Sequence, residues 1–117
     1  MNDLNFSKKT SVSIEEKTTK LGIKEIAALN NEKQKIGFAK YSFCACELID
    51  IEVNDKYRRQ GIGTRLFQTT MRDLKLHGCK DMTWVATENS LPFYFQQGAC
   101  YHFDYPSLRL ARMSIPL

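Results

Sequence analysis

The segment from Arg58 to Thr64, with the sequence Arg-Arg-Gln-Gly-Ile-Gly-Thr, constrains the fold of this chain more than any other stretch. It follows residues 45–53, in which apolar and polar residues alternate as in a β-strand. It leads into apolar residues at helical spacing, which are Ile62, Leu66, Phe67, Met71 and Leu74. A strand, a short glycine turn and an amphipathic helix in direct succession are typical of α/β domains.

The residue types in this turn suit a phosphate group. Gly61 and Gly63 allow the backbone to approach a ligand closely, and the first N–H groups of the helix have no partner within it. Arg58 and Arg59 add positive charge that could reach the phosphates or the phosphorylated ribose of an adenine nucleotide. An ordinary solvated loop is the alternative interpretation. The turn lacks both the Lys-Ser/Thr pair of a P-loop and the G-x-G-x-x-G spacing of a dinucleotide fold.

The remaining segments predict further strands and a second, short helix. We expect an edge strand at 11–17 and other strands at 21–29, 34–43, 82–87, 100–104 and 108–115. The first helix should end at Gly78. The short helix should begin at Asn89 or Ser90 and end at Gly98. The main elements follow the order β-β-β-α-β-α-β-β, which predicts an α/β (α+β) domain with a mixed sheet.

Three local patterns give more detailed predictions. Asn30 and Asn31 tolerate left-handed backbone, so a tight turn should join the strands on either side as a hairpin. Alternation along 45–53 puts Glu47 on one face and Asp50 and Glu52 on the other. This central strand should therefore carry carboxylates on both faces. Trp84 is expected in the core or against the first helix.

Length and charge set the class of protein. With 117 residues, 43% of them hydrophobic, the chain predicts one domain spanning 1–117, whose residues 1–10 are flexible. The net charge of +4 comes from dispersed basic residues, which disfavours a nucleic-acid partner but suits an anionic cofactor. No segment has the apolar run of a secretory signal or a membrane span, so we expect a cytoplasmic protein without membrane contact.

The cysteines and histidines suggest no metal site. The four cysteines lack the C-x-x-C spacing of zinc sites and are too few for a disulfide scaffold, so we expect them reduced and mostly buried: Cys44, Cys46, Cys79 and Cys100. His77 and His102 have no partners at metal-binding spacing, and we interpret both as structural or surface residues.

Two motifs resemble those of the GNAT superfamily of N-acetyltransferases. Arg58, Gly61 and Gly63 match the Q/R-x-x-G-x-G/A motif that follows the fourth strand in that family. Asn89 and the segment 93–98 match a second signature, an Asn followed by an aromatic-Tyr pair and a Gly. The resemblance covers about residues 20–105. It implies a mixed, mostly antiparallel, twisted sheet flanked by helices, with reduced N-terminal helices.

The resemblance also implies acetyl-CoA as the acyl donor and no metal. The pyrophosphate of the donor would contact the whole turn, namely Arg58, Arg59, Gln60, Gly61, Ile62, Gly63 and Thr64. On the same resemblance, Asn89 would be a further residue of the cofactor site. The backbone of Ile51, Glu52 and Val53 would pair with the pantetheine arm like an added strand.

Two side chains are candidate catalytic residues on the same resemblance. Glu47 is the candidate base that takes a proton from the acceptor amine. An exposed strand carboxylate without a role is the alternative, in which case Asp50, Glu52 or a water molecule would be the base. Tyr94 matches the family tyrosine that protonates the departing thiolate, and its alternative is a core aromatic packed with its neighbours.

The implied function is direct transfer of an acetyl group to a primary amine on a small molecule, a peptide or a protein lysine, without an acyl-enzyme. Two other classes stay open, which are a CoA-binding module without turnover that acts through a protein partner and a small nucleic-acid-binding protein. The sequence predicts no counterpart of the N-terminal helices that wall the acceptor site in many relatives. The second subunit of a homodimer could supply that coverage.

Overall fold

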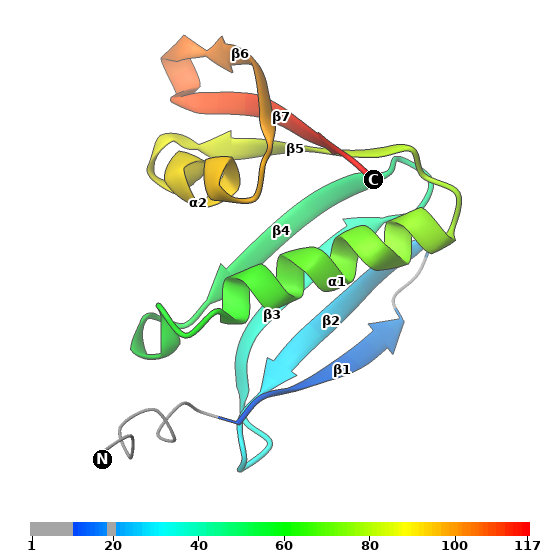
Figure 1. Cartoon of the computed structure of the whole chain (residues 1–117), viewed down its shortest axis with the longest axis vertical. Coiled ribbons are helices and arrows are strands. Elements are labelled where there is room, and N and C mark those ends of the chain that lie inside the picture. The colour runs from blue at the N-terminus through cyan, green and yellow to red at the C-terminus, as the bar shows by residue number, and fades with distance from the viewer. Residues whose placement is uncertain (1–10, 19–20) are drawn as a thin grey trace.

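The computed structural model describes residues 11–18 and 21–117, and its core is one seven-stranded sheet in the order β1-β2-β3-β4-β5-β7-β6 (Figure 1). The strands are β1 (Ser13–Thr18), β2 (Ile23–Leu29), β3 (Lys35–Ser42), β4 (Glu47–Val53), β5 (Asp81–Thr87), β6 (Cys100–Tyr105) and β7 (Leu110–Pro116). The predicted strands and fold class are confirmed. The predicted flexibility of residues 1–10 lies outside the described residues.

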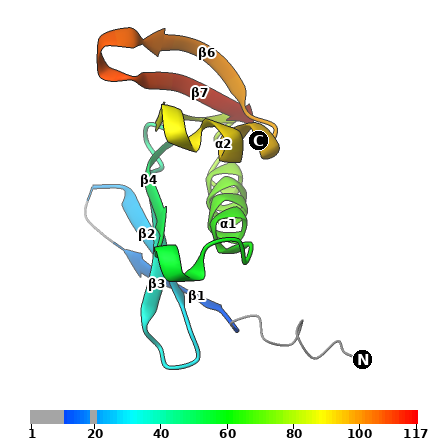
Figure 2. The ribbon, with the colours of Figure 1, turned by 90° about the vertical axis from the view of Figure 1, so that its left-hand side faces the viewer.

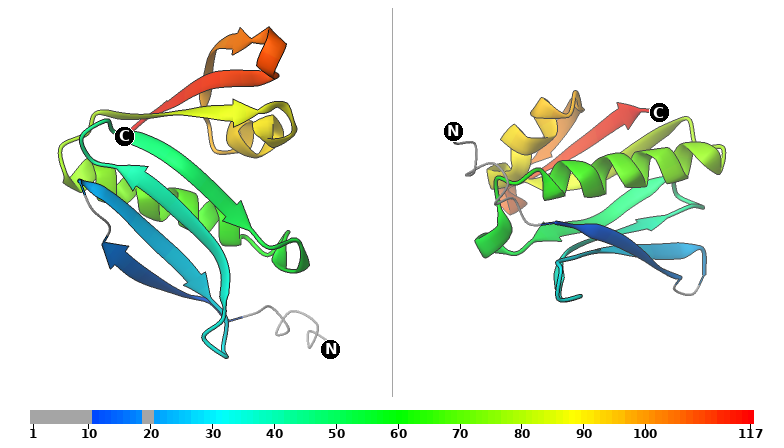
Figure 3. Two further views of the ribbon diagram at one scale, coloured as in Figure 1. Left: turned by 180° about the vertical axis from the view of Figure 1, so that it is seen from behind. Right: turned by 60° about the horizontal axis from the view of Figure 1, so that its bottom comes forward.

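Two α-helices pack on the same face of this sheet (Figure 2). Helix α1 (Ile62–Leu76) connects β4 to β5, and α2 (Leu91–Gln96) connects β5 to β6. Short 3-10 helices lie at Asp55–Tyr57 (η2), Glu88–Ser90 (η3) and Pro106–Leu108 (η4). We call the other face, which is turned toward the viewer in the left panel of Figure 3, the open face. Among the described residues, no helix is both long and apolar enough to span a bilayer.

The core lies between the sheet and α1. The apolar side of α1 buries Leu66, Phe67 and Leu74 completely. Trp84 of β5 is 1% exposed and packs edge-on against Phe67, with ring centroids 5.4 Å apart. The prediction for Trp84 is confirmed. Each such fully buried side chain contributes roughly 1.5–3 kcal/mol to the free energy of folding.

A polar network fastens α1 to β2 and β3. The Tyr41 hydroxyl donates a hydrogen bond of 2.6 Å to the Asp73 carboxylate, and the Lys24 ammonium donates one of 2.8 Å to the same oxygen. Burial, together with the Asp73 charge, raises the pKa of Tyr41. Burial alone would raise the pKa of Asp73, but the hydrogen bonds from Lys24 and Tyr41 outweigh it and leave that pKa below its usual value. The helix is therefore held in register by charge as well as by packing.

A β-bulge in β4 corrects the predicted distribution of carboxylates. Lys40 pairs with Asp50, but the next residue of β3, Tyr41, pairs with Leu48, so β4 carries one extra residue there. Paired residues share a face, and Tyr41 faces α1, so Leu48 also faces the helix. Glu47, Asp50 and Glu52 consequently all lie on the open face, paired with Ser42, Lys40 and Phe38. The prediction of carboxylates on both faces was wrong, because strict alternation assumes an unbroken pleat.

The open face of β1 to β4 carries a row of alternating charges. Lys17 pairs with Glu25, Glu25 with Lys40, and Lys40 with Asp50. A hydrogen bond from Lys35 and the charges of Lys17 and Lys40 together hold the pKa of Glu25 below its usual value. Such a row suits the solvated face of an antiparallel sheet, where opposite-charge cross-strand pairs each contribute roughly 0.2–1 kcal/mol.

The hairpin turn between β2 and β3 is built differently from the prediction. The Asn30 side-chain oxygen accepts hydrogen bonds of 2.9 Å from the backbone N–H groups of Glu32 and Gln34. The residue with positive φ is Lys33, at 62°, rather than either asparagine. Asn30 therefore shapes the turn through its side chain.

The predicted ends of the helices are confirmed, because Gly78 and Gly98 have φ values of 92° and 88° just beyond α1 and α2.

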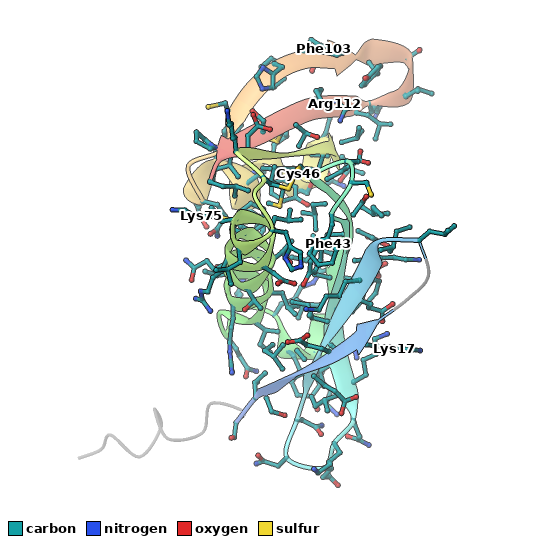
Figure 4. All side chains as sticks on the ribbon, turned by 90° about the vertical axis from the view of Figure 1, so that its right-hand side faces the viewer. Lys17, Phe43, Cys46, Lys75, Phe103 and Arg112 are labelled. Atoms are coloured by element: carbon teal, nitrogen blue, oxygen red, sulfur yellow. A yellow bond between two sulfur atoms is a disulfide. The ribbon has the colours of Figure 1, made fainter. Side chains whose placement is uncertain are left out.

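The cysteines were wrongly predicted to be reduced and mostly buried. Cys46 and Cys79 form a disulfide, with Cα atoms 5.8 Å apart (Figure 4). Cys44 and Cys100 are free and exposed. The helical crossover returns the chain beside its starting strand, so Cys79, just before β5, meets Cys46, just before β4. Spacing in the sequence could not show this contact, because 33 residues separate the pair.

Reduction of the Cys46–Cys79 disulfide should lower the free energy of unfolding by roughly 3 kcal/mol, because a cross-link over 33 residues restricts the unfolded chain. Urea unfolding of the Cys46→Ser, Cys79→Ser double variant against the parent protein measures the difference. Cys44→Ser and Cys100→Ser, which remove exposed free thiols, are the matched controls and should unfold like the parent. Equal stability of the double variant and the parent would contradict the cross-link.

Candidate functional site

The strands β4 and β5 meet at one point and then separate. Their only paired position among the described residues is Glu47 with Thr83, in parallel orientation, next to the disulfide. Beyond that position β4 runs along β3 only, and the two strands diverge in Figure 1. We call the line between β4 and β5 the seam. Past Glu47, the β5 side of the β4 backbone has polar groups that pair with no neighbouring strand of the described chain.

A cavity of about 720 Å³ lies on the helix side of the diverging strands. Its walls are the end of β4, the turn before α1, the first turn of α1, and the segment from the end of β5 into α2. The predicted cofactor and catalytic residues among its lining are Ile51, Glu52, Val53, Arg58, Arg59, Gly61, Ile62, Gly63, Thr64, Asn89 and Tyr94. Two predicted residues, Gln60 and Glu47, do not line it.

Five lining residues were not predicted, namely Tyr57, Thr87, Ser90, Phe93 and Gln96. Phe93 and Gln96 lie within the predicted signature 93–98, so the motif could have suggested them. Tyr57 lies just after β4, and Thr87 is the last residue of β5. Only the fold brings these two residues together at the cavity. The Ser90 hydroxyl, expected to cap α2, instead donates a hydrogen bond of 2.8 Å to the Thr87 carbonyl and closes that corner of the wall.

The turn before α1 is held in an unusual backbone conformation. Arg59 and Gly61 have φ values of 63° and 79°, in the left-handed region. Gly61 precedes α1 without a side-chain cap, and the first turn of the helix contains no acidic residue. The first intrahelical bond runs from the Arg65 N–H to the Gly61 carbonyl, at 3.0 Å. The earlier N–H groups of α1 have no partner within the helix and create a positive end beside the cavity.

The two glycines of the turn serve different purposes. A Cβ on Gly61 would meet no atom within 4 Å, so this glycine is needed for its positive φ. A Cβ on Gly63 would lie 3.3 Å from the Phe93 ring and 3.7 Å from Val53. Gly63 therefore allows α2 and β4 to pack closely against the start of α1. A hydrogen bond of 3.1 Å from the Gln97 amide to the Thr64 hydroxyl joins the same two helices.

The arginines of the turn are available to an anion. Arg58 lies 3.0 Å from the Asp55 carboxylate, but both side chains are mostly exposed. Exposed ion pairs of this kind contribute little stability, so a phosphate could displace Asp55 at small cost. Together with the uncapped end of α1, the arginines bring positive charge and hydrogen-bond donors to this side of the cavity.

Tyr94 belongs both to the core and to the cavity wall. Its ring packs against Trp84, Phe93 and Phe67, with centroid distances of 5.0, 5.2 and 5.9 Å. Burial, with a further contribution from the negative charge of Asp50, raises the pKa of Tyr94 to about 12. The phenol therefore keeps its proton at neutral pH. The predicted core packing and the predicted proton donor are compatible in one residue.

Glu47 lies at the closed end of the seam, on the open face. Its carboxylate is 3.7 Å from the Arg112 guanidinium of β7, and both side chains are about one-third exposed. Tyr94 and Glu47 thus approach the seam from opposite faces of the sheet. Asp50, the residue immediately before Ile51 of the cavity wall, is the carboxylate whose charge acts on Tyr94.

Both histidines have structural contacts. His77 stacks on Phe43 with ring centroids 3.9 Å apart, and His102 shares a hydrogen bond of 2.6 Å with the Ser114 hydroxyl. Within residues 11–18 and 21–117 there is no group of three or more His, Cys, Asp or Glu side chains arranged to hold a metal.

Comparison with known proteins identifies one family. The model of the acetyltransferase (GNAT) family matches residues 9–99. No curated protein matches the sequence. A nourseothricin acetyltransferase shares the fold with 20% identity and a TM-score of 0.66 over 81% of this chain and 65% of its own.

Two further solved structures share the fold and contain the cofactor. The PaiA N-acetyltransferase of Thermoplasma acidophilum, in complex with coenzyme A, is 19% identical, with a TM-score of 0.73 over 83% of this chain and 62% of its own. A GNAT family acetyltransferase of Elizabethkingia anophelis, with acetyl-CoA bound, is 14% identical, with a TM-score of 0.74 over 91% of this chain and 98% of its own. The chain thus spans under two thirds of the nourseothricin and PaiA enzymes and nearly all of the third.

If this turn binds phosphate as the motif predicts, Gly61→Asn should weaken coenzyme A binding at least roughly 10-fold, because the side chain would lie between the backbone and the phosphate. Asn tolerates positive φ, so the fold should be retained. Gly78→Asn is the matched control, since Gly78 also has a positive φ and no atom within 4 Å of a Cβ but lies at the other end of α1. Calorimetric titration with coenzyme A measures both. Equal affinity in the two variants would remove this turn from the binding site.

Proposed function

The chain belongs to the GNAT acetyltransferase family, and on this premise we propose that it is an N-acetyltransferase that transfers the acetyl group of acetyl-CoA directly to a primary amine. The observation that carries the proposal is the cavity beside the seam. It combines an unpaired strand edge, an uncapped helix N-terminus and a protonated tyrosine. A single domain comprising residues 1–117 would hold both substrates.

The turn and α1 would bind the phosphates of acetyl-CoA. The N–H groups of the first helical turn and the side chains of Arg58 and Arg59 supply donors and positive charge. Gln60, outside the cavity lining, would complete the turn through its backbone. Asn89, on the opposite wall, would contribute an amide to the same ligand. These groups fit an anion better than a neutral ligand, because the first turn of α1 contains no competing carboxylate.

The edge of β4 would bind the pantetheine arm. Ile51, Glu52 and Val53 line the cavity, and their backbone pairs with β3 on one side and with no strand of the described chain on the other. An extended chain with amide groups can add to such an edge as a further strand. This arrangement would direct the thioester toward the point where β4 and β5 meet.

The transfer needs one group that accepts a proton and one that donates a proton. Glu47 would take the proton that the amine nitrogen loses as the C–N bond forms, directly or through a water molecule. Tyr94 would give its proton to the sulfur as the C–S bond breaks. The products would be an amide and the free thiol of coenzyme A, and no residue of the protein would carry the acetyl group.

The acceptor would reach the seam from the open face. The cavity lies on the helix side, so the opposite side would leave access to the thioester. A primary amine on a small molecule, a peptide or a protein lysine fits this access. A structural neighbour is named as a nourseothricin acetyltransferase, which supports a small molecule as one candidate acceptor.

The proposal is tested by the release of free thiol from acetyl-CoA in the presence of a panel of amines, polyamines, amino acids and lysine peptides. Thiol release that depends on one class of acceptor supports it. Tight binding of coenzyme A without turnover on any acceptor would instead indicate a binding module that acts through a protein partner.

Tyr94→Phe should lower turnover roughly 100-fold while leaving coenzyme A affinity and the melting temperature near those of the parent, because only the acidic hydroxyl is lost. The ring contacts with Trp84 and Phe67 are retained. Turnover and melting temperature are measured on one preparation. A loss of about 1 kcal/mol of stability with normal turnover would show that the hydroxyl serves packing alone.

Glu47→Gln should lower kcat much more than it weakens acetyl-CoA binding, and the deficit should shrink at high pH as more of the amine is already neutral. Asp50→Asn is the matched control on the same strand and face. Comparison of the two pH profiles of kcat assigns the base. Full activity of Glu47→Gln with loss in Asp50→Asn would transfer the role to Asp50.

A further inference from the structure

Arg112 is the side chain that crosses the seam on the open face. It lies on β7, where it pairs with Val85 of β5 and with Phe103 of β6 (Figure 4). Its Nη1 atom reaches to 3.7 Å from the Glu47 carboxylate on β4. The side chain therefore passes over β5 to reach β4, which pairs with β5 at Glu47 alone.

The surroundings of Arg112 favour one direction for its side chain. Paired residues of a sheet share a face, so Val85 and Phe103 flank Arg112 on the open face. Phe103 in turn packs edge-on against Tyr105, with ring centroids 5.3 Å apart. The aliphatic part of the arginine can cover these apolar groups, while its charged end extends to the nearest carboxylate across the seam. The Arg112 side chain is accordingly only 30% exposed.

Few other neighbours could orient the Glu47 carboxylate. Its cross-strand partner on β3 is Ser42, and its partner on β5 is Thr83, so neither neighbour is charged. Arg112 is the cation paired with it in the described part of the chain. An arginine suits this role because its charge is permanent.

We propose that Arg112 is a positioning residue for the acetyl transfer, which holds the Glu47 carboxylate over the seam so that it faces the incoming amine. The proposal rests on the proposed function, in which Glu47 is the base. In this role Arg112 would act through Glu47, the group that it contacts. Misplacement of a catalytic group by about 1 Å can cost on the order of 100-fold in rate, so a loosely held carboxylate would be measurably slower.

A double-mutant cycle in kcat tests this role. Arg112→Gln should lower kcat roughly 10-fold to 100-fold with the KM for acetyl-CoA unchanged. Arg112→Lys, which keeps the charge, should recover part of the loss. In a Glu47→Gln background, Arg112→Gln should cause no further loss, because the group that Arg112 positions is already absent. A purely structural role would lower kcat by the same factor in both backgrounds.

Arg109→Gln is the matched control, since it makes the same substitution just before β7 and lies away from Glu47. Its kcat should equal that of the parent. Normal kcat in Arg112→Gln while Glu47→Gln is slow would overturn the role of Arg112 and leave the base in place. Normal kcat in Glu47→Gln would overturn the base itself and the positioning role with it. Equal factors in both backgrounds would also overturn the positioning role.

Discussion

The separation of β4 from β5 is the constraint on which the rest of the site depends. A strand in the middle of a sheet normally pairs on both sides, and a buried backbone group without a partner costs as much as a lost hydrogen bond. Here β4 pairs with β5 at Glu47 and nowhere further along the described chain. Among the residues beyond that point, Ile51, Glu52 and Val53 line the cavity, and their edge pairs with no further strand of the described chain, so an extended ligand could add to it.

Such an opening is stable only if its two sides are fastened elsewhere. The Cys46–Cys79 disulfide joins them at the closed end, where the strands meet. On one side, Lys24 and Tyr41 tie α1 to the sheet through Asp73. On the other, the aromatic cluster of Trp84, Phe67 and Tyr94 ties α2 to both β5 and α1. Strands β4 and β5 can therefore remain unpaired beyond Glu47 while the domain stays folded.

The bulge in β4 places most apolar side chains of the strand on one face of the sheet and its carboxylates on the other. Because of the extra residue, Leu48, Ile51 and Val53 all face the helix layer and pack in or against the core, while the three carboxylates of the strand face the other way. The proposed binding groups for an anionic cofactor thus gather around the cavity on the helix side, and the candidate base lies on the open face beside Arg112. The seam is the place where groups from both faces can meet.

The sequence by itself determined the order of the strands and helices and the glycine turn before α1, because these depend on neighbours within a few residues. Most residues of the cavity wall were named through the family motifs, and their convergence required the fold. Periodicity and backbone freedom at Gly61 are local properties. The bulge at β4, the Cys46–Cys79 disulfide and the contact of Arg112 with Glu47 were decided by the tertiary structure alone. Each requires segments that are distant in sequence to be brought side by side, since pairing register and helical crossovers are set by packing of the whole sheet and not by any local pattern.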